Sequence, residues 1–206
     1  MSIRKRISDR LYQWGPGRYY QPTYRRIAEA IGLESGTFLD VGCGPGWLSL
    51  HVAAGKLDID AVGIDHSERM VAAARKNKGN RLNITIREMK ADAIKFPEAT
   101  FDAAAAVQTA HHWKDPDAIL GEIFRVLKPG GRLFLYEADK ACSEVPEGWI
   151  LRSAGWPPDA MVLNGWRRFG MNDDEWADME VRVRRVGFQH TVLDSHGFYR
   201  RMVLTK

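Results

Sequence analysis

The first feature that could do chemistry is a run of three glycines directly after an apolar stretch. Gly42, Gly44 and Gly46 follow residues 38–41, and an apolar helical pattern begins at Trp47. Glycine allows positive φ and lets a ligand approach the main chain closely. The first N–H groups of a helix are also free to meet a ligand. We therefore predict a strand, a ligand-binding turn and a helix within an α/β domain.

The glycine spacing and one carboxylate separate the ligand classes. A dinucleotide fingerprint has the form G-x-G-x-x-G, and here Trp47 occupies the place of its third glycine. No Gly-Lys-Ser/Thr run marks a Walker-type phosphate loop. Asp40 stands two residues before Gly42, where a carboxylate repels a pyrophosphate and attracts a cation. S-adenosylmethionine, with its ammonium and sulfonium, fits this pattern better than the cofactor of a dehydrogenase.

Residues 40–46, Asp-Val-Gly-Cys-Gly-Pro-Gly, resemble the glycine-rich motif of class I S-adenosylmethionine-dependent methyltransferases. The run from His111 to the Leu-Lys-Pro-Gly-Gly turn at 127–131 is similar to the small-molecule group of ubiquinone and menaquinone biosynthesis, methyltransferase type 11. The resemblance covers residues 37–139 well. It implies S-adenosyl-L-methionine as cofactor and a Rossmann-like α/β fold. That fold is a seven-stranded, mostly parallel sheet with an antiparallel C-terminal strand and helices on both faces.

The resemblance also implies a set of cofactor-binding residues. Asp65 ends the next predicted strand, and its two acceptor oxygens suit the two ribose hydroxyls. In the family, the residue after this acid and a later Met pack on the adenine, and an Asp after the third strand accepts from its amino group. Simple capping, core packing and a solvent-facing turn are the alternatives for Asp65, Met70 and Asp92. The candidate cofactor-binding residues are Asp40, Gly42, Cys43, Gly44, Gly46, Asp65, His66, Met70, Ala91, Asp92, Ala93 and Gln108.

The candidate catalytic residues follow a nearly unbroken apolar strand over residues 101–107. Ligands of open α/β sheets lie beyond the carboxyl ends of the strands, so His111 and His112 should line the methyl-transfer pocket. Methyl transfer needs an aligned acceptor, exclusion of water and a base if the acceptor loses a proton. Either histidine is a candidate base, although the pair could instead order the loop. Adjacent histidines rarely reach one ion together, and we expect no metal.

Aromatic residues at two places are candidates for the acceptor site. A helix is predicted from Tyr24 to Ile31, and N-terminal helices of similar methyltransferases lie over the cofactor. Residues 140–172 hold three tryptophans in a long connection, which indicates a substrate-covering insertion. Packing of the same residues on the core, or a dimer contact, is the alternative. The candidate substrate-binding residues are Tyr19, Tyr20, Trp113 and Trp149, with Tyr24 as a further candidate for the lid.

The 206 residues suit a single methyltransferase domain with one core. Its predicted parts are an N-terminal helical lid (1–36), a cofactor-binding core (37–139), the substrate-covering insertion (140–172), and a C-terminal helix and hairpin (173–206). Within these parts, a first helix is predicted over residues 3–14, and residues 172–175 resemble a capping box at the start of the last helix.

The composition limits which binding partners and which cellular location we expect for the protein. Two cysteines form no disulfide framework, no apolar run reaches the ~20 residues of a membrane span, and no signal region is visible, so we expect a cytoplasmic protein. The net charge of +4 is concentrated in residues 1–26. This basic arm leaves open an RNA or protein methyltransferase, and a non-catalytic cofactor-binding protein is the other alternative. We expect a small-molecule acceptor rather than nucleic acid, and a monomer or homodimer.

Overall fold

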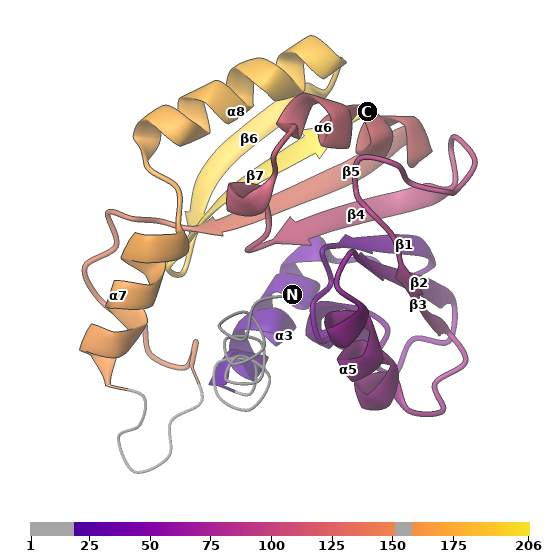
Figure 1. The fold of residues 1–206 in the computed structure, drawn as a ribbon, viewed down its shortest axis with the longest axis horizontal. Coiled ribbons are helices and arrows are strands. Elements are labelled where there is room, and N and C mark those ends of the chain that lie inside the picture. The colour runs from indigo at the N-terminus through magenta and orange to yellow at the C-terminus, as the bar shows by residue number, and fades with distance from the viewer. Residues whose placement is uncertain (1–18, 151–157) are drawn as a thin grey trace.

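The computed structural model describes residues 19–150 and 158–206, which form one mixed sheet covered by helices (Figure 1). The helix expected over residues 3–14 lies outside the described residues. The strands are β1 (Gly36–Val41), β2 (Ile59–Asp65), β3 (Ile84–Glu88), β4 (Phe101–Val107), β5 (Leu127–Ala138), β6 (Gln189–His196) and β7 (Tyr199–Thr205). The helices are α3 (Gln21–Ile31), α4 (Trp47–Val52), α5 (Glu68–Lys78), α6 (Pro116–Val126), α7 (Asp159–Phe169) and α8 (Asp173–Val186), with a 3₁₀ turn η1 (Ala110–His112).

The sheet has the strand order β3-β2-β1-β4-β5-β7-β6. The first five strands of this order run parallel, and β7 is antiparallel to both β5 and β6. This confirms the predicted seven-stranded, mostly parallel sheet with an antiparallel strand near its C-terminal edge. The chain moves outward from β1 to β3 and then returns to β4 on the other side of β1. Such a reversal opens a crevice at the carboxyl ends of β1 and β4, where ligands of this architecture bind.

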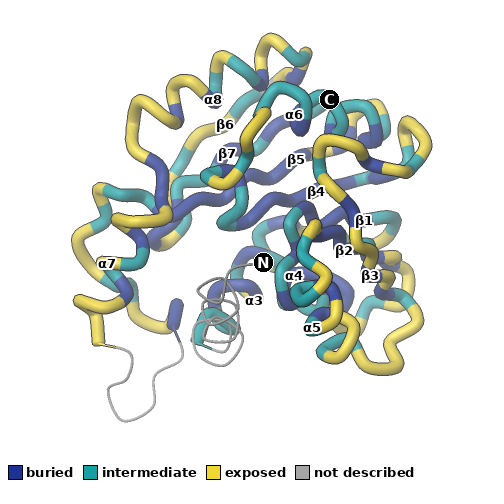
Figure 2. The backbone as a smooth tube through the Cα atoms, viewed as in Figure 1, coloured by how far each residue is buried: buried dark blue, intermediate teal, exposed yellow. Residues whose placement is uncertain are grey.

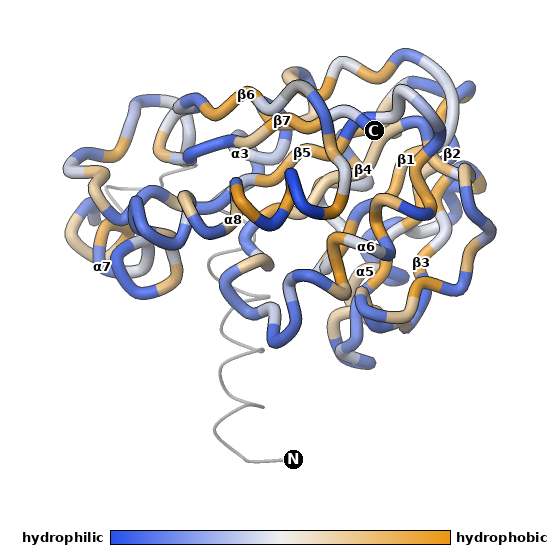
Figure 3. The backbone as a smooth tube through the Cα atoms, turned by 90° about the horizontal axis from the view of Figure 1, so that it is seen from above, coloured by the Kyte–Doolittle hydropathy of each residue, from blue (hydrophilic) through white to orange (hydrophobic). Residues whose placement is uncertain are grey.

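The central strand β4 shows why the sheet is buried on both faces. Ala103 and Ala105 pack into one core and Ala104 and Ala106 into the other, each with 1% exposure or less. A strand covered on both faces needs no polar alternation, as its apolar sequence predicted. The central strands are accordingly the darkest, most buried part of Figure 2, and apolar colour dominates them in Figure 3.

Two groups of helices cover the two faces. Ile27 of α3, Val71 of α5 and Trp166 of α7 belong to one core, whereas Leu120 of α6 and Trp176 of α8 belong to the other. Figure 1 shows α6 and α8 on one side of the sheet and α3, α5 and α7 on the opposite side. None of the helices described here has the length and apolar composition to cross a membrane.

Local capping chemistry fixes several helix ends. Gly32 ends α3 with a left-handed φ of 61°, which glycine adopts without a side-chain clash. The Asp115 side chain accepts from the main chain of the first turn of α6, whose first residue is proline. Asn172 and Glu175 form the predicted capping box of α8 in both directions. The C-terminal end predicted for α3 and the first residues predicted for α6 and α8 are therefore confirmed.

The Leu-Lys-Pro-Gly-Gly sequence at 127–131 predicts a turn that ends α6 before a strand beginning at Arg132. The structure differs from this prediction. In the structure β5 begins at Leu127, directly after α6. Leu127 pairs with Phe101 and Arg132 pairs with Ala103, so the residues between them form an irregular excursion inside the strand. The Gly130 N–H and the Gly131 carbonyl bond to the backbone of Lys206 at 2.9 and 3.0 Å, which holds the excursion against the C-terminal strand.

Truncation of one buried side chain tests whether the residues beneath α6 form a core that stabilises the fold. Leu120 is fully buried in the core beneath α6, whereas Leu82 is 96% exposed. We expect Leu120→Ala to lower the free energy of unfolding by about 2–5 kcal/mol through lost burial and a residual cavity. The control Leu82→Ala should change it by no more than about 0.5 kcal/mol. Urea denaturation measures both, and equal losses in the two variants would contradict the assignment of the core.

Candidate functional site

The residues singled out in the sequence gather at the carboxyl edge of the parallel strands. Asp40 is near the end of β1 and Asp65 ends β2, while Gln108 and Glu137 stand at the ends of β4 and β5. Register brings these ends together, because β1 pairs with both β2 and β4 and β4 pairs with β5. The sequence-predicted turn, acids and histidines therefore belong to one edge of the sheet.

In the glycine turn after β1, two of the three glycines are closely packed and the third faces open space. Gly42, Gly44 and Gly46 all have left-handed φ values, between 51° and 80°. A Cβ on Gly42 would collide with the Thr109 side chain, and one on Gly46 would lie 3.0 Å from the Ala74 methyl group. At Gly44 a Cβ would meet no atom of residues 19–150 or 158–206 within 4 Å. The turn thus presents open main chain at Gly44, which is what a bound ligand requires.

Asp65 ties the glycine turn to the end of β2. One carboxylate oxygen accepts from the Gly44 N–H at 2.9 Å, and the other accepts from the Ser67 N–H at 2.8 Å. The residue is only 7% exposed. His66 beside it has a side chain 69% exposed, with its Nδ1 3.8 Å from the carboxylate. Each Asp65 oxygen retains a lone pair for a further donor.

Asp40 lies beneath the turn rather than on its open side. It is 2% exposed, and one of its oxygens accepts from the Ser49 N–H at 3.1 Å and from the Ser49 hydroxyl at 2.7 Å. Burial raises the pKa of the Asp40 carboxyl to about 7; the bonds from Ser49 oppose this shift, and nearby Asp65 adds to it. Asp40 therefore holds the first turn of α4 in place and half ionises near neutral pH.

The other predicted cofactor residues occupy different surroundings. Cys43 is buried, and burial raises the pKa of its thiol well above the ordinary value, so the thiol stays protonated. Met70 is half-buried on α5. In the segment after β3, Ala91 is half-buried, while Asp92 and Ala93 are exposed. Their contact with a cofactor stays a prediction.

Gln108 has a backbone conformation that few side chains adopt. Its φ of 53° makes it one of two non-glycine residues with left-handed φ in the described parts of the chain. Such strain is concentrated at functional sites, where the surrounding structure enforces it. Its main-chain N–H donates to the Tyr136 carbonyl at 2.8 Å, and its side-chain amide donates to Glu137 at 3.3 Å.

Glu137 organises the loop that follows β4. Its side chain is fully buried, yet one oxygen accepts from the Thr109 and Ala110 N–H groups at 2.8 and 2.6 Å. The other oxygen lies 2.8 Å from Nδ1 of His111. Because an ionised carboxylate can only accept, a neutral His111 ring that bonds to it carries its proton on Nδ1 and leaves Nε2 as an acceptor.

The histidine pair is asymmetric. The His111 side chain is 12% exposed, whereas His112 is exposed. The two rings lie 3.9 Å apart, and both lie near the Phe169 ring of α7. Trp113, at the end of η1, is half-buried and packs against the core beneath α6. His111 has the Glu137 carboxylate against its Nδ1.

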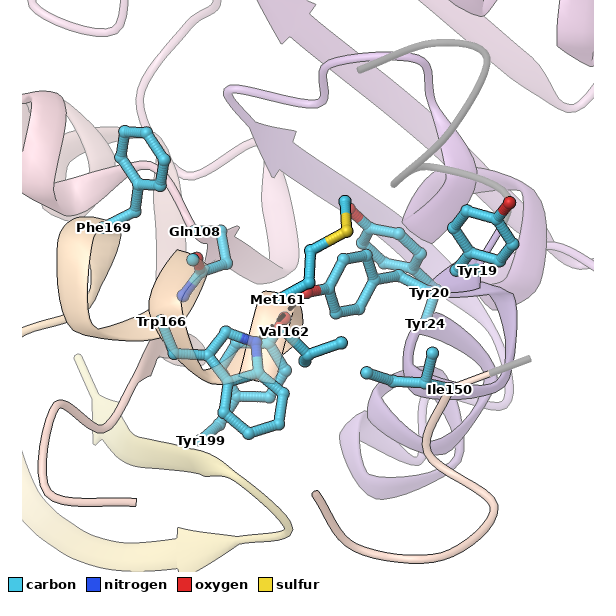
Figure 4. Close-up of a pocket in the computed structure, with 11 residues that line it drawn as sticks. Tyr19, Tyr20, Tyr24, Gln108, Ile150, Met161, Val162, Trp166, Phe169 and Tyr199 are labelled. Atoms are coloured by element: carbon cyan, nitrogen blue, oxygen red, sulfur yellow. Dashed lines mark hydrogen bonds between the residues drawn. The ribbon is translucent and has the colours of Figure 1, made fainter. Parts of the chain in front are cut away.

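A cavity of about 200 Å³ adjoins Gln108 and is walled mainly by aromatic side chains (Figure 4). It contains two of the predicted acceptor residues, Tyr19 and Tyr20, as well as the lid candidate Tyr24. Figure 4 shows Tyr19, Tyr20 and Tyr24, at and just before the start of α3, on one side and residues of α7 and β7 on the other. The complete lining in the described residues is Tyr19, Tyr20, Tyr24, Gln108, Ile150, Met161, Val162, Gly165, Trp166, Phe169 and Tyr199.

Trp149 lies outside this lining, although its neighbour Ile150 belongs to it. The Trp149 ring packs edge-on against His196 at 4.9 Å and beneath the Arg26 guanidinium at 5.4 Å. Its carbonyl accepts from the buried Thr23 hydroxyl. Trp149 thus joins α3 to the β6–β7 turn, where a side chain on Gly197 would collide with its ring.

Sequence analysis missed Glu137 and most of the cavity wall. Glu137 was visible only as the last polar residue of a predicted strand. The residues of α7 follow a helical pattern, but nothing local says that they face Gln108, which is separated from them by about fifty positions. A useful signal was the carboxylate at the strand end, since strand ends form the ligand edge of such sheets. In the described residues no cluster of three His, Cys, Asp or Glu could hold a metal ion.

Comparison with known proteins agrees with this geometry. A family model described as a methyltransferase domain, Methyltransf_11, matches residues 39–135. The demethylmenaquinone methyltransferase of Thermus thermophilus is 35% identical over 118 residues, which are 55% of this chain and 53% of that protein. The sterol 24-C-methyltransferase of Aspergillus fumigatus is 32% identical over 143 residues, 61% of this chain and 38% of that protein. The chain therefore spans about half, or less, of the length of these curated relatives.

Solved structures share the fold. A SAM-dependent methyltransferase from Aquifex aeolicus superposes with a TM-score of 0.65 at 22% identity, over 91% of this chain and 89% of that one. The [4+2]-cyclase SpnF superposes with a TM-score of 0.63 at 23% identity, over 88% of this chain and 79% of that one. At such identities the likeness concerns the fold alone.

The raised pKa of Asp40 predicts a pH-dependent stability. Between about pH 4 and pH 7 the unfolded carboxyl ionises while the buried one stays protonated. The contribution of Asp40 to the free energy of unfolding therefore falls as pH rises through this window, by at most about 1.4 kcal/mol per pH unit, and is constant above it. In urea denaturation, Asp40→Asn should gain stability relative to wild type over this range. Exposed Asp60→Asn should not, and a parallel pH profile for Asp40→Asn would contradict the assignment.

The Glu137–His111 contact predicts the tautomer of His111. We expect the neutral Nδ1–H form in the wild type, read from the ring nitrogen and carbon chemical shifts in NMR. In Glu137→Gln the amide oxygen can keep the two backbone donors, which turns the NH₂ group toward the ring. Nδ1 must then accept, so the Nε2–H form should dominate. Glu88→Gln, exposed at the end of β3, is the control, and an unchanged His111 signal in Glu137→Gln would show that the contact does not hold the ring.

Proposed function

Because this chain belongs, through residues 39–135, to the class I S-adenosylmethionine-dependent methyltransferase family, we propose that it methylates a small-molecule acceptor. The observation that carries the proposal is the bond from the Gly44 N–H to Asp65. It fixes an open glycine turn and an acidic strand end side by side. This pairing suits a ligand with a ribose and a cationic tail better than one with a pyrophosphate.

The residues present fit the methyl donor. S-adenosylmethionine, when bound, supplies an electrophilic methyl group on a sulfonium. The open main chain at Gly44 admits the ligand, and the unused lone pairs of Asp65 accept the ribose hydroxyls. Asp92, exposed after β3, accepts from the adenine amino group, with Met70 and His66 beside the ring. Asp40, Gly42, Cys43 and Gly46 shape the turn, while Ala91 and Ala93 flank Asp92.

The acceptor site lies on the other side of Gln108, which lines the aromatic cavity. Tyr19 and Tyr20 form part of its wall, and α7 covers it as part of the proposed insertion 140–172. Holding the acceptor there would align it with the donor and exclude water, which is most of what a methyl transfer requires. Trp113 and Trp149 remain sequence-based predictions for acceptor contact.

His111 is the proposed general base, and Glu137 is the residue that positions it. With its proton held on Nδ1, the ring offers Nε2 to a proton leaving the acceptor. The leaving group of the donor is neutral, so no acid is needed. His112, exposed and stacked near His111, is the second candidate from the sequence.

The domain division, the cytoplasmic location and a monomeric or homodimeric state also remain predictions from the sequence. A small acceptor is favoured over nucleic acid because the cavity beside Gln108 is narrow and aromatic. Residues 1–18, which carry most of the basic arm, lie outside the described residues, so docking through that arm stays the alternative.

Calorimetric titration with S-adenosylmethionine, S-adenosylhomocysteine and NADH tests the donor assignment. We expect the first two to bind wild-type protein and Asp65→Ala to weaken both by at least about tenfold. Asp60→Ala removes an exposed carboxylate from the same strand and should change neither. Thermal melting checks that both variants fold.

Binding of NADH alone would overturn the proposal, as would full S-adenosylmethionine affinity in a folded Asp65→Ala variant. If the donor binds as expected, a screen with methyl-labelled donor identifies the acceptor. The absence of transfer to every small acceptor, with transfer to RNA or protein, would favour the macromolecular alternative.

A further inference from the structure

We propose that the cavity between α3 and α7 takes an uncharged, mainly apolar acceptor with one small ring system, and that Gly165 sets the size it admits. This inference rests on the proposed methyl transfer, because it assigns the cavity to the acceptor. The observations that carry it are the chemistry of the wall, the volume of the cavity and the space in front of Gly165.

The wall offers rings and aliphatic groups but no charge. In the described residues, the lining contains no Asp, Glu, Lys, Arg or His. The polar side-chain atoms of this lining belong to Gln108, to the Trp166 indole and to tyrosine hydroxyls. An ion buried there without a partner would lose its hydration, and hydrogen bonds from tyrosines and one amide do not offset that free-energy cost. The wall therefore favours an uncharged ligand with at most one or two polar groups.

Aromatic rings also attract ammonium groups through their faces, so a cationic ligand is the alternative to an uncharged one. The carboxylate that follows β5, Glu137, is fully buried, and its oxygens are taken up by main-chain N–H groups, Gln108 and His111. The cavity thus offers a cation only ring faces and no described counter-charge. A neutral ligand leaves nothing uncompensated.

The volume limits the ligand to a small ring system. A dry apolar cavity of about 150 Å³ is enough to bind benzene. The present cavity, at about 200 Å³, has room for a single substituted ring or two fused rings. At its rim Met161 and Phe169 are 48% and 44% exposed, which is unusual for such large apolar side chains on one short helix.

The cavity is held open by contacts that do not involve a ligand. Trp166 stacks on Phe198 with ring centres 3.8 Å apart and planes 9° apart. Its indole N–H donates to the Tyr20 hydroxyl at 3.1 Å, shown as a dashed line in Figure 4. These two contacts bind α7 to the β6–β7 hairpin and to α3. The wall is therefore preorganised, which reduces the entropy lost on binding.

Gly165 is the feature of α7 that the fold itself does not explain. Glycine inside a helix costs about 1 kcal/mol relative to alanine, and its backbone here has no left-handed φ that would demand it. Among the described residues, a Cβ at this position would meet no atom within 4 Å. Since Gly165 lines the cavity, a side chain there would occupy ligand space without displacing any of these atoms.

Calorimetry on the full chain with three probes tests the proposal: 2-naphthol, choline and 3,3-dimethylbutan-1-ol, the neutral isostere of choline. We expect 2-naphthol to bind and 3,3-dimethylbutan-1-ol to bind more tightly than choline. Gly165→Leu should weaken binding of the neutral probes by at least about tenfold. Gly165→Ala, which fills less space, should weaken them less.

The matched control is Gly121→Leu. Gly121 is also a helix-interior glycine with open space at its Cβ, but it belongs to α6 on the other face of the sheet. This variant should bind every probe as the wild type does. Both leucine variants should melt at or above the wild-type temperature, because leucine favours a helix over glycine.

Tighter binding of choline than of its neutral isostere would overturn the proposal in favour of an ammonium-binding aromatic cage. Unchanged 2-naphthol affinity in Gly165→Leu would overturn the role of Gly165, and no binding of either neutral probe would overturn the acceptor class. S-adenosylhomocysteine binding, measured in parallel, separates the two hypotheses. If wild-type protein does not bind S-adenosylhomocysteine, the proposed methyl transfer itself is contradicted. If Gly165→Leu still binds it, the substitution has changed only the acceptor cavity.

Discussion

The buried carboxylate of Glu137 is the interaction on which the arrangement at the sheet edge depends. Parallel pairing brings β4 and β5 together, but it provides no acceptors for the Thr109 and Ala110 N–H groups in the loop after β4. Glu137 supplies them by accepting from the Thr109 and Ala110 N–H groups, and the same group holds the His111 ring. Thr109 in turn fills the space that a side chain on Gly42 would need. One carboxylate therefore links β5, the histidine loop and the glycine turn.

Asp40, Asp65 and Glu137 show how this edge tolerates acids that burial disfavours. Each is at most 7% exposed, and each accepts at least one main-chain N–H. Asp40 receives both of its bonds from one residue, Ser49, and burial still raises its pKa to about 7. A local departure of this kind from what favours folding is expected at functional sites.

The sequence predicted those parts of the site that depend on local chemistry. Glycines in a turn, an acid at a strand end and a capping box such as Asn172 with Glu175 act over a few residues, so their types reveal them. The same reasoning singled out Tyr19 and Tyr20, which line the cavity beside Gln108. It did not find Glu137, whose donors come from another strand, or the stacking of Trp166 on Phe198. Those contacts arise only when distant segments pack, and no local periodicity encodes them.

The residues matched by the family model and the residues that line the cavity are almost entirely different. Sequence similarity to relatives therefore identifies the methyl donor better than the acceptor. The matched residues 39–135 contain the glycine turn, Asp65 and the histidine loop, but of the described cavity wall they contain only Gln108. The rest comes from α3, Ile150, α7 and Tyr199, which lie before or after that range. Relatives that share the core are named for acceptors as different as a sterol and a menaquinone precursor. The described cavity is accordingly built mainly by the segments that flank the matched residues, and Gln108 is the matched residue at which it begins.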